Sequence, residues 1–105
     1  MKSKWNEPGL PLGEAVEAAL DKKALEITVL DMKEAASFTD YFLICSGSSS
    51  RQMQAISDEI ERRLRLTGLR PFHVEGYNHA EWILMDYVDF VVHIFSERAR
   101  VFYDL

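Results

Sequence analysis

Residues 41–51 read YFLICSGSSSR. The unbroken apolar run Tyr41–Cys45 is too short for a helix, so it predicts a strand that is buried on both faces of a sheet. Gly47 and the serines after it break that strand. Ser49 and Gln52 have the spacing of a capping box, which predicts that a helix begins here. The chain is therefore predicted to pass from a buried strand directly into a helix.

The predicted helix is amphipathic. Apolar residues recur at helical spacing from Met53 to Leu64, and charged residues occupy the other faces. Gly68 supplies the stop signal. We interpret the charged faces as solvated surface with weak pairs between residues four positions apart, rather than as a binding site.

The residues before this stretch predict a helix and a second strand. Pro11 opens an apolar stripe with helical spacing, which ends at Asp21. Alternating apolar and polar residues then predict a half-buried strand over residues 25–32. Residues 1–10 show no periodicity and are expected to be a flexible lead-in to a single domain over residues 11–105.

Three more strands and a helix are predicted after the central helix: strands over residues 71–76, 82–86 and 89–95, and a helix that Ser96 caps. The connection Tyr87–Val88 is short enough to make the last two strands a hairpin. The elements follow the order α-β-β-α-β-β-β-α. The predicted fold class is therefore α/β (α+β), with a mixed five-stranded sheet flanked by helices.

Charge and composition exclude several classes of function. The chain has 105 residues, a net charge of −5 and a pI of about 5.1. Proteins that bind phosphates over a broad surface are normally basic, so this balance argues against nucleic acid or an anionic membrane as partner and suits a basic protein. No apolar run approaches the roughly 20 residues of a membrane helix. The lone Cys45 excludes an internal disulfide, which favours a cytoplasmic protein.

The sequence offers two weak candidates for catalytic chemistry. The turn Gly47–Ser50 has the position of a turn found in nucleotidyltransferase-type folds, but the Asp-x-Asp pair that holds their metals is missing from the later strands. His73, Glu75 and His93 are candidate zinc ligands, but nothing in the sequence determines their distances. We predict a protein that is not an enzyme, with no cofactor and no metal. A nucleotidyltransferase-fold enzyme that uses the Gly47–Ser50 turn is the alternative.

Aromatic and acidic residues gather around the strand predicted over residues 82–86. Because side chains alternate along a strand, the set that starts at Trp82 shares one face, and this set ends in an acid that is costly to bury unpaired. Aromatic residues ringed by acids are typical anchors for a protein partner. The alternative is that Trp82 packs in the core. The predicted partner-binding residues are Trp82, Leu84 and Asp86, with Tyr87 extending their face and Glu81 at its rim.

Four blocks of sequence, in the correct order, resemble the ribosomal silencing factor family, RsfS, also called Iojap-like. They are Ser37–Gly47, Ser50–Gln52, His73–Gly76, and Glu81–Tyr87 followed by Val91–Phe95 and Phe102–Leu105. The resemblance extends over residues 12–105, which is nearly the whole chain.

The resemblance implies a non-catalytic translation factor. Such proteins bind the large ribosomal subunit through its ribosomal protein number fourteen. They sterically block joining with the small subunit, which represses translation under nutrient limitation. The implied fold is a nucleotidyltransferase-like core without catalytic residues, and some members are homodimers.

Two departures from the family pattern are expected to matter. The family commonly has glycine in the hairpin turn where this chain has Val88, and a β-branched residue tolerates positive φ badly, so a different turn geometry is expected. The family usually continues with charged residues and a tryptophan where this chain ends at Leu105, so the end is expected to be trimmed or disordered.

Overall fold

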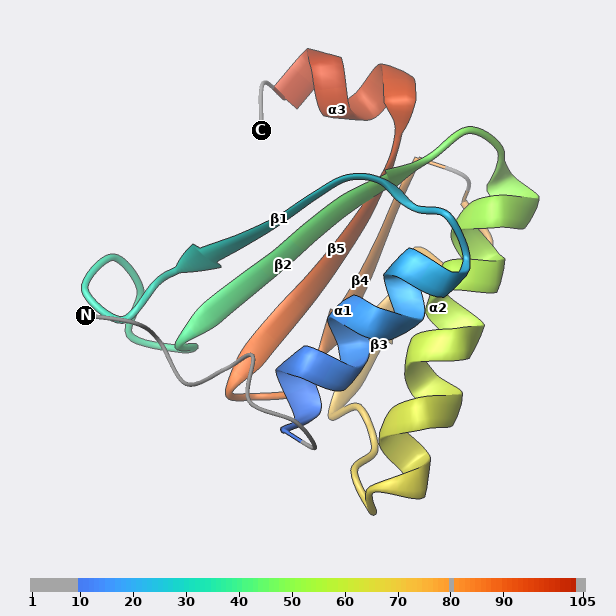
Figure 1. Cartoon of the computed structure of the whole chain (residues 1–105). Coiled ribbons are helices and arrows are strands. Elements are labelled where there is room, and N and C mark those ends of the chain that lie inside the picture. Colours follow the sequence, from blue (N-terminus) through green and yellow to red (C-terminus); the bar gives the residue numbers. More distant parts are fainter. Residues whose placement is uncertain (1–9, 80, 104–105) are drawn as a thin grey trace.

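The computed structural model describes residues 10–79 and 81–103, which form three helices and one five-stranded sheet in the predicted order (Figure 1). The helices are α1 (Pro11–Asp21), α2 (Ser50–Leu66) and α3 (Glu97–Tyr103). The strands are β1 (Leu25–Asp31), β2 (Tyr41–Gly47), β3 (His73–Glu75), β4 (Trp82–Asp86) and β5 (Phe90–Ser96). The expected lead-in, apart from residue 10, and the expected disordered end lie outside the described residues.

The sheet has the strand order β1-β2-β5-β4-β3. Strands β2 and β5 are parallel, and the other neighbouring pairs are antiparallel, so the sheet is mixed as predicted. β2 lies between two other strands, and its residues from Leu43 to Gly47 are buried. This confirms the buried strand predicted from the apolar run. The implied likeness to a nucleotidyltransferase core stays an expectation from the resemblance.

Helices α1 and α2 cover one face of the sheet (Figure 1). The predicted inner side of α2, from Met53 to Leu64, is fully buried against side chains of β2, β4 and β5. Each such side chain stabilises the fold by about 1.5–3 kcal/mol. α3 packs on the opposite face, where Ala99 contacts Ile44 and Phe95. The two faces of the sheet are therefore covered to different extents.

Serine side chains cap two of the helices. Ser49 Oγ accepts the Gln52 N–H at 3.1 Å, which confirms the predicted cap of α2. The return bond differs from a standard capping box, because Gln52 Oε1 accepts the N–H of Ser48 at 2.6 Å. Ser96 Oγ accepts the Ala99 N–H at 3.0 Å and caps α3 as predicted.

The hairpin turn between β4 and β5 places Val88 in the left-handed region, with a φ of 74°. The Asp89 N–H donates to the Tyr87 carbonyl at 2.9 Å across this residue, and Asp86 Oδ1 accepts the Val88 N–H at 2.8 Å. The turn therefore holds valine in the conformation that its β-branched side chain was expected to avoid. Such a residue is strained, since the left-handed conformation costs an L-residue about 1–2 kcal/mol.

Replacing Val88 with glycine is expected to stabilise the protein. The relief of strain outweighs the extra chain entropy of glycine, so Val88→Gly should raise the free energy of unfolding by about 1 kcal/mol. That gain corresponds to a melting temperature about 5 °C higher, measured by circular dichroism. Val88→Ala, which keeps the strained φ, should gain less. A melting temperature for Val88→Gly at or below that of the parent would contradict this account.

Candidate functional site

The sheet face opposite α1 and α2 is covered at one end by α3, and part of the remainder is exposed. We call this exposed part the open face; its residues are Phe42, Trp82, Leu84 and Asp86 of the sheet, together with Phe38 of the β1–β2 connection, whose ring centroid lies 6.2 Å from that of Phe42. Phe38 is 66% exposed and Trp82 is 39% exposed, whereas the other three are half-buried. Apolar surface that a fold leaves uncovered is a candidate for binding another protein.

Strand alternation determines which side chains of β4 reach the open face. Ile83 and Met85 are fully buried on the helix side, and Trp82, Leu84 and Asp86 lie on the other side, as predicted. The exposure of Trp82 shows that it is not simply a core residue. Three of the five predicted binding residues therefore share one partly exposed face.

Neighbouring side chains determine the orientation of the Trp82 indole. Its Nε1–H donates to His93 Nδ1 at 3.2 Å, and its ring centroid lies 5.8 Å from that of His93 and 5.0 Å from that of Phe95. The His93 ring in turn meets Phe42 edge-on at 4.5 Å. Burial lowers the pKa of His93 to about 4, so the ring is neutral at pH 7 and Nδ1 accepts. These aromatic contacts hold the Trp82 side chain in one orientation.

Gly76 also positions Trp82. It has a φ of 78°, and a Cβ atom at this position would overlap the carbonyl oxygen of Trp82. Only glycine therefore fits where the chain passes the start of β4. The sequence showed a glycine beside a short strand, but it carried no signal of this contact with a residue six positions away.

Glu81 lies beside Trp82 as predicted, but its carboxylate is already engaged. It accepts from Ser96 Oγ at 2.7 Å and pairs with Arg98 Nη2 at 2.8 Å. These two bonds, the serine bond first, hold the pKa of Glu81 below its usual value. Glu81 therefore ties the start of β4 to the start of α3, and its charge is partly neutralised.

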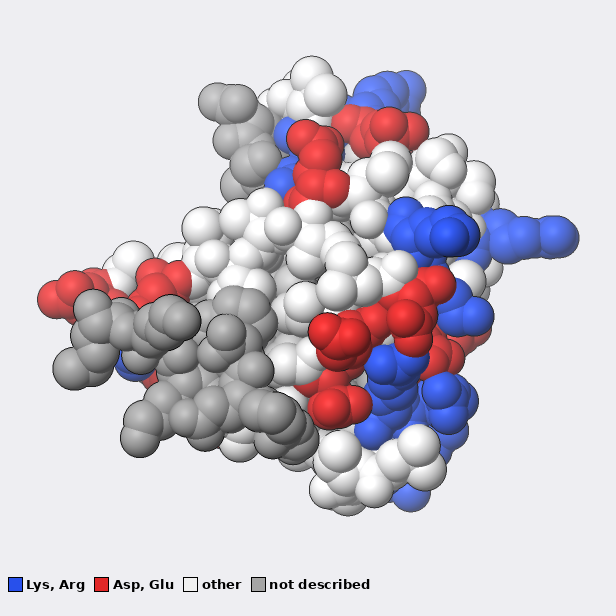
Figure 2. Space-filling view, in the orientation of Figure 1, with Lys and Arg blue, Asp and Glu red and all other residues white. Residues whose placement is uncertain are grey.

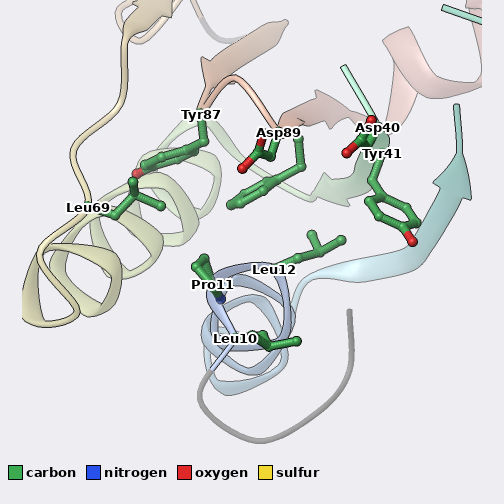
Figure 3. Close-up of a pocket in the computed structure, with 9 residues that line it drawn as sticks. Leu10, Pro11, Leu12, Asp40, Tyr41, Leu69, Tyr87 and Asp89 are labelled. Carbon is green, nitrogen blue, oxygen red and sulfur yellow. The ribbon is translucent and has the colours of Figure 1, made fainter. Parts of the chain in front are cut away.

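The expectation that Tyr87 extends the face of Trp82 is wrong. Tyr87 is an odd number of residues from Trp82 along the chain, so it faces the helix side, where it is 4% exposed and stacks on Phe90 at 5.1 Å. Figure 3 shows Tyr87 pointing toward Leu69, where with Asp89 it lines a hollow of 310 Å³. Burial raises the pKa of its hydroxyl, which has no hydrogen-bond partner among the described residues.

The structure does not bring the candidate zinc ligands together. His73 Nε2 lies 2.5 Å from Glu75 Oε2 on β3, but His93 is on β5, and β4 separates these strands. Within residues 10–79 and 81–103, no three His, Cys, Asp or Glu side chains are grouped so that they could hold a metal ion. The zinc hypothesis is therefore wrong for these three residues.

The Gly47–Ser50 turn is occupied by local bonds. Both the N–H and the Oγ of Ser48 donate to Gln52 Oε1, at 2.6 and 2.8 Å, while Ser49 caps α2. The turn thus has the structure of a helix cap.

In the part of the chain that the structure describes, no helix has the length and apolar character needed to cross a bilayer.

The charged surface of α2 consists of paired side chains, as interpreted from the sequence. Glu59 Oε2 lies 2.7 Å from Arg62 Nη2 and 2.9 Å from Arg63 Nε, and Arg63 also pairs with Asp21 of α1. Figure 2 shows Lys and Arg interleaved with Asp and Glu on the side of α1 and α2. The Glu59 and Arg63 side chains are only 12% and 22% exposed, whereas fully exposed pairs contribute typically about 0–1 kcal/mol each.

The buried His93 predicts that stability falls in mild acid. Its pKa is about 4 in the folded state and about 6.5 in the unfolded chain, so between these values the unfolded state binds more protons. Stability from this group is therefore complete above pH 6.5 and is lost as the pH falls toward 4. His93→Gln, which can still accept from Trp82, removes the effect. Between pH 7 and pH 5 the parent should lose about 2 kcal/mol more than this variant in urea unfolding; equal losses would contradict the assignment.

Comparisons with known proteins agree with the fold and the sequence blocks. A family model described as "Ribosomal silencing factor during starvation" matches residues 9–105. The ribosomal silencing factor RsfS of Halalkalibacterium halodurans is 42% identical over 91 residues, 87% of this chain and 78% of that protein. A crystal structure of a Chromobacterium violaceum protein matches with a TM-score of 0.86 at 31% identity, over 90% of this chain and 78% of that one. The Mus musculus relative "Mitochondrial assembly of ribosomal large subunit protein 1" is 28% identical over 87 residues, 80% of this chain and 38% of that protein. Since the family match extends over nearly all of the sequence, the chain belongs to the ribosomal silencing factor (RsfS) family.

Proposed function

We propose that this chain binds the large ribosomal subunit through its ribosomal protein number fourteen and sterically blocks joining with the small subunit. It would thereby repress translation in the cytoplasm under nutrient limitation. The family supports a role at the ribosome, and the name of the mouse relative points to the large subunit. The proposal that binding uses the open face rests on Trp82, which is 39% exposed there and is hydrogen-bonded to His93.

The open face has the character of a protein-binding surface. Trp82 and Leu84 provide an apolar centre, and Asp86 adds an acid at the far end of the strand. Protein interfaces commonly combine aromatic anchors with a polar rim. The chain's net charge of −5 suits a basic partner and disfavours indiscriminate binding to RNA. These features support docking through β4.

Removing the indole of Trp82 is expected to weaken binding without unfolding the domain. Loss of a central aromatic anchor typically costs about 2 kcal/mol or more, roughly thirtyfold in affinity. Trp82→Ala should therefore bind isolated large subunits at least about thirtyfold more weakly than the parent in a sedimentation assay. Circular dichroism should show that the variant is folded.

Two control variants separate the open face from the rest of the surface. Leu66→Ala truncates a side chain that is 76% exposed on α2, and it should bind like the parent. Tyr87→Phe removes only a buried hydroxyl, so it should also bind like the parent. If folded Trp82→Ala binds large subunits as tightly as these controls, the open face is not the docking surface.

The same sedimentation runs without subunits test whether the chain forms a homodimer.

We also infer that the protein has no catalytic turnover, because the Gly47–Ser50 turn is occupied by capping bonds that leave Ser48 bonded to Gln52. Nucleoside triphosphate with magnesium should therefore shift the melting temperature by less than about 1 °C. A shift of that size corresponds to a stabilisation by ligand binding well below 1 kcal/mol. A larger shift that disappears in Ser48→Ala would favour the alternative of a nucleotidyltransferase-fold enzyme. An unchanged melting temperature in both proteins agrees with a binding protein.

A further inference from the structure

A small hollow lies on the open-face side of β3 and β4. It has a volume of 170 Å³ and is lined by Glu75, Gly76, Trp82 and Leu84. Glu75 is paired with Leu84 across the two antiparallel strands, and Trp82 lies two residues before Leu84 on the same side. Gly76 passes close to the Trp82 backbone and contributes its own backbone to the wall of the hollow. The hollow has room for one side chain, since pockets for drug-sized ligands measure about 300–1,000 Å³.

The lining of the hollow matches a long cationic side chain. Leu84 and the indole of Trp82 offer apolar surface for an aliphatic stem, as lysine and arginine side chains require. The face of a tryptophan ring attracts a cation more strongly than other aromatic rings do. Glu75 adds a carboxylate at the edge, with 65% of its side chain exposed. A neutral apolar group would use the apolar surface, but neither the attraction of the tryptophan ring for a cation nor the carboxylate.

The charges around Trp82 distinguish Glu75 from the other nearby acid. Glu81 is already paired with Arg98 at 2.8 Å. Glu75 is bonded to His73, which is charged only if protonated, and this bond uses one of its two carboxylate oxygens. Glu75 is therefore the acid beside Trp82 that an incoming cation can approach without first displacing an arginine.

We propose that this hollow binds an arginine or lysine side chain of the basic protein partner, with its stem on Leu84 and its charged head between Trp82 and Glu75. The identity of the partner rests on the proposed function. The chemistry of the hollow rests on its four lining residues and is testable without the ribosome.

The first experiment titrates the full chain with N-acetyl-arginine amide and follows the Trp82 indole N–H by NMR. The control ligand is N-acetyl-citrulline amide, which has nearly the same shape but no charge. The arginine compound should shift the Trp82 indole and the backbone amides of Glu75 and Leu84, and the citrulline compound should shift them far less. Glu75→Gln should reduce the arginine response. Equal responses to both compounds, or no response of Trp82, would overturn the proposal.

The second experiment measures affinity for isolated large subunits with matched acid variants. Glu75→Gln preserves side-chain volume and should weaken binding about fivefold at low salt, with the difference shrinking as salt is raised. The Glu81 carboxylate is already paired with Arg98, so Glu81→Gln should change the affinity less than about twofold. Equal effects of the two variants would overturn the role of Glu75. If the parent fails to bind large subunits, the proposed function fails, while the arginine titration still decides the chemistry of the hollow.

Discussion

The parallel pairing of β2 with β5 determines where the other strands and the helices lie. Tyr41 is paired with Phe90 and Gly47 with Ser96, so two strands far apart in sequence lie side by side along their whole length. Parallel strands cannot be joined by a tight turn, and the chain between them must cross over the sheet. α2 forms the main part of that connection, and its apolar side covers one face of the sheet. β3 and β4 then extend the sheet on the far side of β5.

This arrangement leaves the two faces unequal. α1 and α2 bury the helix-side face, whereas the opposite face has the short helix α3 at one end. The side chains in between contact one another instead, so that Trp82 packs on His93 and Phe95 while part of its ring remains exposed. An anchor that is already oriented loses less conformational freedom on binding than a mobile one. The same contacts that complete the fold therefore also orient Trp82, the residue that we propose to bind the partner.

Backbone and charge contacts set the details of that surface. Gly76 allows the chain to pass close to Trp82, where any side chain would meet the Trp82 carbonyl, and it also lines the hollow beside the indole. On the other side, Glu81 is held by Ser96 and Arg98, which couples β4 to the beginning of α3. The two glutamates beside Trp82, Glu81 and Glu75, therefore differ in their contacts. One holds two elements together, and Glu75 remains 65% exposed.

Local patterns in the sequence determined the elements, because periodicity and capping depend on residues only a few positions apart. The run Tyr41–Cys45, the cap at Ser49 and the alternation along β4 were all predicted in this way, and the ordered blocks identified the family. Tertiary structure decided what depends on distant residues. Strand β4 separates His93 on β5 from the other two candidate zinc ligands on β3. Tyr87, by contrast, follows the local alternation of β4 and lies in the core. The bonds of Glu81 to Ser96 and Arg98, the need for glycine at position 76 and the partial exposure of Trp82 depend on strand pairing, a long-range contact that local sequence patterns do not encode.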